Sequence, residues 1–418
     1  MPDAHSSRAT LALVSIVSFM IAFDAMVVAT ALVPIRAELQ APIEHLQWTL
    51  SAYNLTFALL LLPGAILGDR FGRRRSLLIG LALFVAASVA CALAGSIAQL
   101  IAARALQGVG AGIAMPLAMA LLGAAFPKEQ RARALGVFSG ITGLALILGP
   151  ALGGSIAEGL DWRWVFWLNL PLGLIVGPLL RARVAESRDP AATLRPGPLL
   201  RGLGAMFRSP AFTSAVAAGF LFYAPLYGTL FFLPQFLQAQ GAGLLESGLK
   251  LLPWCATLFI TAPLAGRWVA RIGERAMVVG GVLLQAAGLA SLAWLATRHV
   301  PYAWLVPALM AAGIGVSAAM PAAQAAALGA VAPAALGRAS GVFNALRFLG
   351  GVFGVALAVQ VFGHAGAAVD ADAFSAGFAR AMNALALLSL LAAAAALGLP
   401  SRRPSGPSRA QLTKESSR

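Results

Sequence analysis

Long apolar runs recur twelve times along this chain of 418 residues, with only short polar segments between them. A helix needs about 20 mainly apolar residues to cross the hydrocarbon core of a membrane. The runs lack the alternating pattern of a barrel strand, so we predict helices. The chain is therefore predicted to be an all-α integral membrane protein with twelve transmembrane helices, at residues 10–33, 47–67, 76–96, 99–125, 133–157, 164–182, 211–237, 246–266, 276–296, 302–328, 339–363 and 375–398.

The composition excludes a soluble protein. Hydrophobic residues make up 60% of the chain and charged residues 11%, whereas soluble domains average about 45–50% apolar and about 25% charged residues. The mean hydropathy is +0.83. Water is therefore not the main solvent of the surface of this molecule.

The net charge of +15 would suggest a nucleic acid partner in a soluble protein. Here the position of the charges gives a better explanation. Of the 30 Lys and Arg, 23 lie on one side of the predicted membrane and five on the other, while the acidic residues divide evenly. This bias is typical of loops that stay in the cytoplasm. We predict a multi-pass protein of the inner (cytoplasmic) membrane, with both termini cytoplasmic, surrounded by the lipid bilayer and binding no nucleic acid.

The two halves of the chain share short motifs at a constant separation of 205 residues. The pairs are Met115-Pro116 with Met320-Pro321, Arg133 with Arg338, and Gly149 with Gly354. Chance similarity between Ala- and Gly-rich helices explains three such matches poorly. Repeats of this kind place a substrate site between the halves, near the middle of the membrane.

We therefore predict two pseudo-symmetric six-helix bundles. The predicted parts are an N-terminal bundle at 1–182, a cytoplasmic linker at 183–210, a C-terminal bundle at 211–400 and a disordered, basic cytoplasmic tail at 401–418.

A basic loop rich in glycine follows the second predicted helix, with the sequence Gly68-Asp69-Arg70-Phe71-Gly72-Arg73. Glycines permit tight turns and close approach of helices. Asp69 can lie near the positive N-terminus of another helix and pair with an arginine, as an electrostatic latch that holds one of two conformations. Simple anchoring by positive charges on the cytoplasmic side explains the arginines, but it does not explain an aspartate between spaced glycines.

This loop resembles the motif between helices 2 and 3 of the major facilitator superfamily. Arg104-Ala-Leu-Gln107-Gly108 is similar to the helix 4 motif of its proton-coupled members. The segments 162–173 and 340–351 resemble motifs of the multidrug:proton antiporter branch, which usually has fourteen helices. The resemblance covers essentially the whole chain and implies the major facilitator fold.

The chain departs from that branch in two places. The polar segment 181–210 stands where two further helices are usual, and Met26 and Ala29 stand where the first-helix motif usually carries Thr and Asn. These departures concern the substrate more than the fold.

Two more arginines are assigned to the latch. Arg133 lies in a repeated motif at the start of the fifth predicted helix, and Arg347 lies in the eleventh. Arg347 has an alternative, because a long side chain about two turns from a helix end can extend to the membrane surface.

The fifth predicted helix resembles the antiporter motif of the superfamily through five residues, Gly140, Gly149, Pro150, Gly153 and Gly154. The glycines permit close helix packing, and the proline permits a bend. Small residues are also common in ordinary packing of membrane helices. The link to export comes from the resemblance alone.

Asp24 is the only acidic residue inside a predicted span, since Glu246 stands at the very start of its span. A charge in the middle of a membrane costs at least ~2.5 kcal/mol, so such a residue is a functional candidate. We predict that Asp24 carries the coupling proton and that Arg104 is its counter-charge, since both lie at similar depths in their helices. A purely structural ion pair is the alternative.

Aromatic side chains at helical spacing, among them Tyr223 and Tyr227, share one face of the seventh predicted helix. In a cavity such a face would bind flat or cationic compounds, although packing against neighbours explains the spacing equally well. The candidate cavity residues are Tyr53, Asn54, Gln107, Tyr223, Tyr227, Gln235, Gln324 and Asn344.

These features predict a secondary transporter, not an enzyme, because titratable groups are too few in the spans for catalysis. We expect a monomer, driven by the proton gradient without cofactor or metal, that exports amphipathic or cationic drug-like small molecules by proton antiport. The alternative on the same fold is a transporter of a single metabolite, sugar or siderophore. A sensor would need a soluble output domain, and no segment is long enough.

Overall fold

The computed structural model describes residues 4–188, 203–298, 300–332, 335–363 and 371–401. Within these ranges the chain is helical, with short loops and no strand. Twelve helices in this part of the chain are long and apolar enough to cross a membrane. The prediction of an all-α protein with twelve membrane-spanning helices is therefore confirmed. The predicted tail at 401–418 and much of the linker at 183–210 lie outside the described residues.

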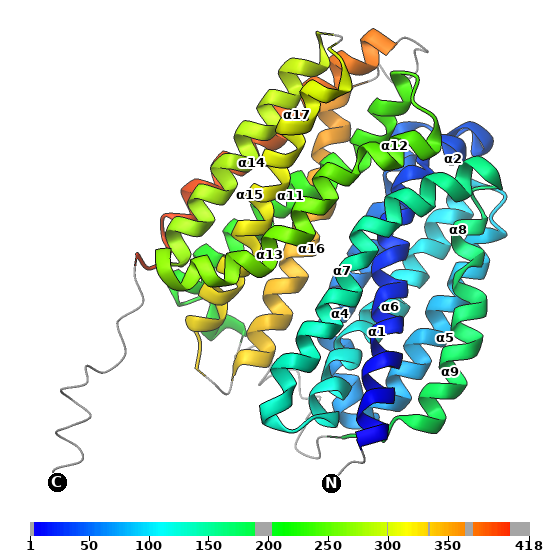
Figure 1. The fold of residues 1–418 in the computed structure, drawn as a ribbon, viewed down its shortest axis with the longest axis vertical. Coiled ribbons are helices and arrows are strands. Elements are labelled where there is room, and N and C mark those ends of the chain that lie inside the picture. The colour runs from blue at the N-terminus through cyan, green and yellow to red at the C-terminus, as the bar shows by residue number, and fades with distance from the viewer. Residues whose placement is uncertain (1–3, 189–202, 299, 333–334, 364–370, 402–418) are drawn as a thin grey trace.

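The first half of the molecule, within the described residues, consists of six long helices and three short ones near their ends (Figure 1). The elements are α1 (Ala4–Thr30), α2 (Leu32–Leu39), α3 (Ile43–Leu46), α4 (Trp48–Phe71), α5 (Arg73–Ala92), α6 (Ile97–Ala125), α7 (Lys128–Gly159), α8 (Trp164–Trp167) and α9 (Asn169–Arg183).

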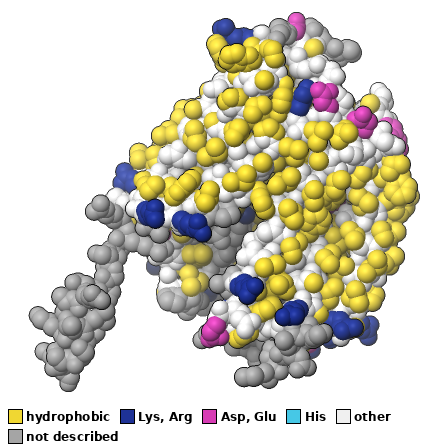
Figure 2. Space-filling view, in the orientation of Figure 1, with side chains coloured by type: hydrophobic (Ala, Val, Ile, Leu, Met, Phe, Trp, Pro, Cys, Tyr) yellow, Lys and Arg dark blue, Asp and Glu magenta, His cyan; other side chains and the backbone are white. Residues whose placement is uncertain are grey.

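The second half repeats this plan. Its elements are α11 (Pro210–Ala239), α12 (Leu244–Lys250), α13 (Leu252–Ile272), α14 (Glu274–Ala296), α15 (Tyr302–Gly329), α16 (Leu336–Phe362) and α17 (Ala371–Ala396). An apolar belt covers the middle of the molecule, and Lys and Arg gather toward the end where α1 begins (Figure 2).

The first predicted helix, 10–33, ends earlier than expected. The structure ends α1 at Thr30 and starts α2 at Leu32. Pro34 has no N–H to donate to the carbonyl of Thr30, four residues before it, so the regular hydrogen-bond ladder is interrupted there. The amide Nε2 of Gln238 in α11 lies 3.4 Å from the freed Thr30 carbonyl and donates to it. The break thus supplies a contact between the two halves.

Equivalent glycines pack the helices of each half in the same way. Gly110 of α6 lies against α5, where an added Cβ would meet the carbonyl of Gly80 at 2.7 Å. Gly315 of α15 lies against Gly281 of α14 in the same manner. Gly110 and Gly315 are 205 residues apart, the separation of the sequence motifs. Close backbone approach through small residues is the usual way in which membrane helices pack.

The two halves meet most closely at the end of the bundle where α2 and α12 lie, and their ribbons separate toward the end where α1 begins (Figure 1). The Cβ of any side chain at Gly154 of α7 would overlap the carbonyl of Leu244, and one at Gly248 of α12 would overlap the carbonyl of Pro150. The carboxylate of Glu158 accepts a hydrogen bond from the backbone N–H of Leu245 at 2.6 Å.

We predict that Gly354→Ala destabilises the protein, because the new Cβ would overlap the carbonyl of Ala224 in α11. Overpacking of this kind costs about 1–3 kcal/mol. The measurement is the melting temperature of purified protein in detergent. The matched control is Gly280→Ala, where nothing lies within 4 Å of the new Cβ. Equal melting temperatures for the two variants would contradict the packing described here.

Candidate functional site: a buried ion pair and a row of aromatic rings

Asp24 of α1 is fully buried inside the first half. Its carboxylate forms an ion pair with Arg104 of α6 through the atoms Oδ2 and Nη1. The amide Nε2 of Gln107 donates to Oδ1 at 2.8 Å, and the amide Nδ2 of Asn169 donates to the same oxygen at 3.1 Å. Three donors from two other helices therefore surround this carboxylate. They replace the water that a charge loses on burial.

Arg104 is also fully buried, and the protein uses most of its donors. Its Nε donates to the carbonyl of Thr49 at 2.9 Å, and its Nη1 donates to Oε1 of Gln107 at 2.6 Å. The guanidinium carbon lies 4.3 Å from the ring centre of Tyr53 in α4. Its Nη2 has no acceptor. The expected contact between Asp24 and Arg104 is therefore present, while its role in proton coupling stays a prediction.

Sequence reasoning missed two residues of this network, Asn169 and Ser88. Asn169 begins α9 and its Nδ2 also donates to the hydroxyl of Ser88 at 2.9 Å, while Ser88 donates to the carbonyl of Phe166. Asn169 lies in the segment 162–173, which carried part of the family resemblance. That resemblance was the signal that could have identified Asn169. Ser88 lies in an ordinary apolar helix, and nothing in the sequence distinguished it.

A row of aromatic rings connects the two halves. Tyr53 stacks on Phe57 in α4, and Phe57 meets the ring of Phe348 in α16 edge to face, with centroids 4.8 Å apart. Phe348 in turn contacts Tyr223 and Tyr227 of α11, at 5.7 and 6.3 Å. Edge-to-face and offset arrangements at these distances are favourable. We call these five residues the aromatic row.

Arg347 lies at the end of the aromatic row that belongs to the second half of the molecule. Its guanidinium carbon is 4.5 Å from the ring centre of Tyr223 and 5.2 Å from that of Phe348. The side chain is 9% exposed. In the described part of the chain, no ion pair joins it to an acidic residue. In this conformation the side chain lies against Tyr223 of α11, and the assignment of Arg347 to the latch stays a prediction.

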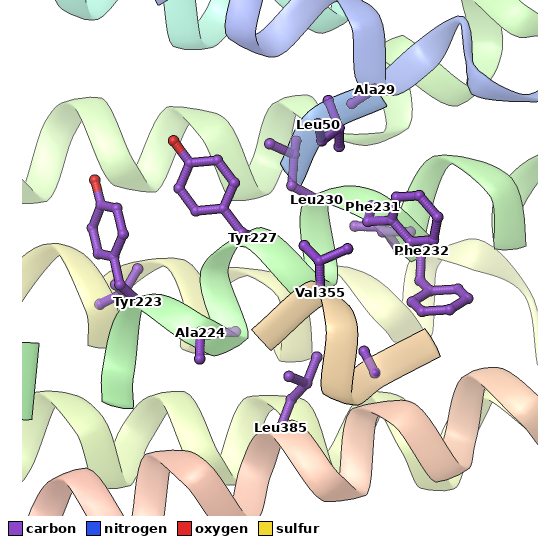
Figure 3. Close-up of a cluster of buried hydrophobic side chains, with 14 of the residues drawn as sticks. Ala29, Leu50, Tyr223, Ala224, Tyr227, Leu230, Phe231, Phe232, Val355 and Leu385 are labelled. Atoms are coloured by element: carbon purple, nitrogen blue, oxygen red, sulfur yellow. The ribbon is translucent and has the colours of Figure 1, made fainter. Parts of the chain in front are cut away.

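The candidate cavity residues fall into two groups. Tyr53, Tyr223 and Tyr227 belong to the aromatic row, with both tyrosines of α11 projecting on the same side of the helix (Figure 3). Gln107 is held by the carboxylate of Asp24 and is not free to bind substrate. Three further amides, those of Asn54, Gln235 and Asn344, each donate back to a carbonyl of their own helix. Gln324 is partly buried in α15.

The loop between α4 and α5 folds back on its own half. Asp69 pairs with Arg73 at 2.7 Å, and Arg70 is exposed. Gly72 has a φ of +111°, a conformation that L side chains rarely adopt. Gly68 leaves no space for a side chain beside Leu117. The predicted pairing of Asp69 with an arginine is thus observed, with the partner inside the loop.

The backbone N–H groups at the start of α5 are capped by a residue that sequence reasoning missed. The carboxylate of Glu186, just after α9, accepts from Arg74 at 2.9 Å and from Arg75 at 3.2 Å. A carboxylate at a helix N-terminus is favourable. Arg133 is exposed at the start of α7, and within the described residues no ion pair joins it to Asp69.

The glycines of α7 serve both halves. Gly149 and Gly153 lie against α1, where an added Cβ would meet Met26 at 2.5 Å and the carbonyl of Val27 at 2.9 Å. Gly154 and the carbonyl of Pro150 lie against α12 of the second half. Gly140 has nothing within 4 Å. Four of the five residues of the motif therefore make α7 a direct link between Asp24's helix and the other half.

Two repeated six-helix units, the first of which holds a buried ion pair and both of which share a row of rings, have the architecture of a multi-pass membrane transporter. The family comparison agrees with this class. The model of the Major Facilitator Superfamily matches residues 14–355 and, in a second match, residues 246–415. The chain belongs to the major facilitator superfamily and is a transporter, not an enzyme.

Several curated relatives are drug-resistance proteins. The chain is 31% identical over 392 residues to the multidrug resistance protein Stp of Mycobacterium tuberculosis, covering 81% of this chain and 73% of that protein. It is 33% identical over 394 residues to the methylenomycin A resistance protein of Streptomyces coelicolor, with coverages of 81% and 82%. It is 29% identical over 413 residues to the multidrug transporter MdtP of Bacillus subtilis, with coverages of 85% and 75%.

Solved structures share the fold at low sequence identity. A bacterial homologue of the human lysosomal transporter Spinster aligns with a TM-score of 0.80 and 19% identity, over 97% of this chain and 100% of that one. A D-xylose–proton symporter aligns with a TM-score of 0.78 and 17% identity, over 94% and 98%. These likenesses confirm the predicted fold.

We predict that Arg104→Gln destabilises the protein strongly, because it leaves Asp24 as a buried charge without a counter-charge. Removing one partner of a buried pair costs about 3–5 kcal/mol. Adding Asp24→Asn to this variant is expected to recover most of the loss. Melting temperatures in detergent for the two single variants and the double variant test this.

The control is the partly exposed pair of Arg163 with Glu38, whose side chains are 25% and 46% exposed. Exposed pairs contribute only about 0–1 kcal/mol, so Arg163→Gln is expected to change little. A double variant at Asp24 and Arg104 as unstable as Arg104→Gln alone would contradict the ion-pair explanation.

Proposed function

We propose that this protein exports amphipathic drug-like compounds from the cytoplasm by proton antiport. The observation that carries the proposal is Asp24, the only acidic residue in the described spans except those near their ends, fully buried and held by three donors. A charged residue at this depth is a strong functional candidate in a transporter. The names of the multidrug relatives support the type of substrate, and the name of another relative, the drug efflux pump JefA of Mycobacterium tuberculosis, supports the direction.

A proton on Asp24 would remove the attraction between its carboxylate and Arg104. Asp24 would keep only neutral hydrogen bonds, and Arg104 would become a buried cation without a counter-charge, which is unfavourable. A rearrangement that gives Arg104 a new partner or water would then lower the free energy. In this way proton binding would favour a second conformation.

The packing offers a route for that change to reach the second half. Met26, two residues after Asp24, lies against Gly149 of α7. Gly154 of α7 lies against Leu244 in α12. A shift of α1 therefore has to move α7, and α7 has to move against α12. Alternating exposure of a site between the halves is the motion that this arrangement supports.

Transport of a single metabolite or sugar on the same fold is the alternative. The D-xylose–proton symporter shares only 17% identity with this chain, so that likeness concerns the fold alone. We favour the export of drug-like compounds on the names of the relatives. The location in the cytoplasmic membrane, the monomeric state and the independence from cofactors belong to the same proposal.

The first test uses inverted membrane vesicles whose lumen has been acidified. We expect amphipathic drugs of both charge signs, added one at a time, to include some that release protons from the lumen, as followed with a pH-sensitive dye. We expect Asp24→Asn to abolish this release, because asparagine cannot bind the coupling proton.

The control is Asp161→Asn, which removes an exposed carboxylate and is expected to leave proton release unchanged. If Asp24→Asn released protons like the unchanged protein, the coupling proton would have to bind elsewhere. If no drug released protons, the antiport proposal would be wrong.

We also predict that both termini are cytoplasmic. Alkaline phosphatase fused after residue 418 is expected to be inactive, since it folds only outside the cytoplasm, and a green fluorescent protein fused there is expected to fluoresce. The comparison fusion is alkaline phosphatase inserted in the loop at 93–96, at the opposite end of α5, which is expected to be active. The reverse pattern would overturn the predicted orientation.

A further inference from the structure

We infer that Arg347, together with Tyr223 and Tyr227, binds the anionic group of aromatic, amphipathic substrates. This inference deepens the proposed function and rests on it, because it names the substrate class of the same transporter. It narrows the expectation of amphipathic or cationic compounds, drawn from the sequence, to amphipathic anions.

The first step concerns the charge of Arg347. The side chain lies in the spanning helix α16 and is nine-tenths buried. Its Nε has no hydrogen-bond acceptor, and among the described residues no acidic side chain lies within ion-pair distance of it. A buried cation with unpaired donors is unfavourable, and such residues in transporters commonly line the path of a substrate or ion.

The second step excludes Asp24 as the counter-charge. Its carboxylate already accepts from Arg104, Gln107 and Asn169. Away from their ends, the described spans therefore hold one buried acid, whose carboxylate is occupied, and the buried Arg347, whose Nε has no acceptor; the other buried acid, Glu274, lies at the end of its span. A cationic substrate finds no free carboxylate there, whereas an anionic substrate finds a free guanidinium.

The third step concerns geometry. Arg347 lies over the face of the Tyr223 ring, at 4.5 Å. Stacking uses the flat face of a guanidinium and leaves its N–H groups, which point outward in the plane, available to hydrogen-bond a carboxylate or sulfonate. The ring of Tyr223 thus holds the guanidinium in one orientation without consuming its donors.

The fourth step concerns the apolar body of the substrate. Tyr223 and Tyr227 lie side by side with ring centres 5.6 Å apart, and their hydroxyl oxygens point in the same direction (Figure 3). Phe348 and Phe57 extend the aromatic surface into the first half. A flat aromatic ring placed here would contact both halves, which is where alternating access requires a substrate to lie.

The test uses three naphthalene compounds of similar size: 2-naphthoate, 2-naphthamide and 2-naphthylmethylammonium. Their binding to the full-length protein in nanodiscs of neutral phosphatidylcholine is measured by equilibrium dialysis, with binding to empty nanodiscs subtracted. We expect the naphthoate to bind roughly tenfold tighter than the amide, because only the anion can form charge-assisted hydrogen bonds with Arg347. The ammonium compound is expected to bind most weakly.

In Arg347→Gln the preference for the naphthoate over the amide is expected to disappear, while binding of the amide itself is retained. Retained amide binding also shows that the variant is folded. Arg347→Lys is expected to keep part of the preference, since it keeps the charge but not the planar fork. The control is Arg271→Gln, which makes the same change of charge at an exposed position and is expected to behave like the unchanged protein.

Tighter binding of the ammonium compound, a naphthoate preference that survives in Arg347→Gln, or no binding of any of the three would each overturn the inference. Dialysis requires no proton gradient. The inference can therefore fail while drug-triggered proton release from vesicles succeeds, and proton antiport can fail while the anion preference is observed.

Discussion

An ionised carboxylate can remain inside a membrane only where protein groups replace the water around it. Asp24 meets this condition through Arg104, Gln107 and Asn169, which come from α6 and α9. The ion pair of Asp24 with Arg104 also involves α4. Arg104 donates to the carbonyl of Thr49, and its guanidinium lies over the ring of Tyr53. One charge thus determines how four helices of the first half are arranged. Any event that neutralises this charge changes the balance of all these contacts together.

Close packing of helices connects the ion pair of Asp24 with Arg104 to the contacts between the two halves. Glycines at the contacts of α1 with α7, and of α7 with α12, bring backbones so near that a Cβ would overlap the neighbouring helix. Helices in such contact move together or separate, because no flexible side chain lies between them to absorb a small shift. The glycines and proline of α7 therefore matter through the surfaces they bring into contact. This gives a physical reason for a motif that the sequence linked to export only by resemblance.

The fold was predictable from the sequence because hydropathy reports directly on a membrane-spanning helix, and because the repeat at 205 residues exposed the two halves. The pairing of Asp24 with Arg104 was predictable because charged residues are rare inside membrane spans and because these two lie at similar depths in their helices. The partners Asn169 and Ser88 were not, since an amide or hydroxyl at a helix end has many ordinary roles. The contacts of Arg347 were not predictable for a related reason. Its position along α16 was clear from the sequence, but the direction of its side chain depends on Tyr223, whose place is set by the packing of α11 against α16.

The buried arginines of the two halves have different partners, an acid in the first half and an aromatic ring in the second. This difference bears on mechanism. In the first half the arginine and the acid satisfy each other, so that site can respond to a proton without a substrate present. In the second half Arg347 stacks on a ring and its Nε has no acceptor among the described residues, so under the proposed substrate class that site would respond to an anion without a proton present. Tyr53, under Arg104, and Tyr223, under Arg347, belong to the same row of rings, which crosses between the halves through Phe57 and Phe348. Because each ring contacts the next, a change in the position of either arginine alters the packing that holds the other. Under the two proposals made above, competition between a proton and an anionic substrate would have its physical basis in this one continuous set of contacts.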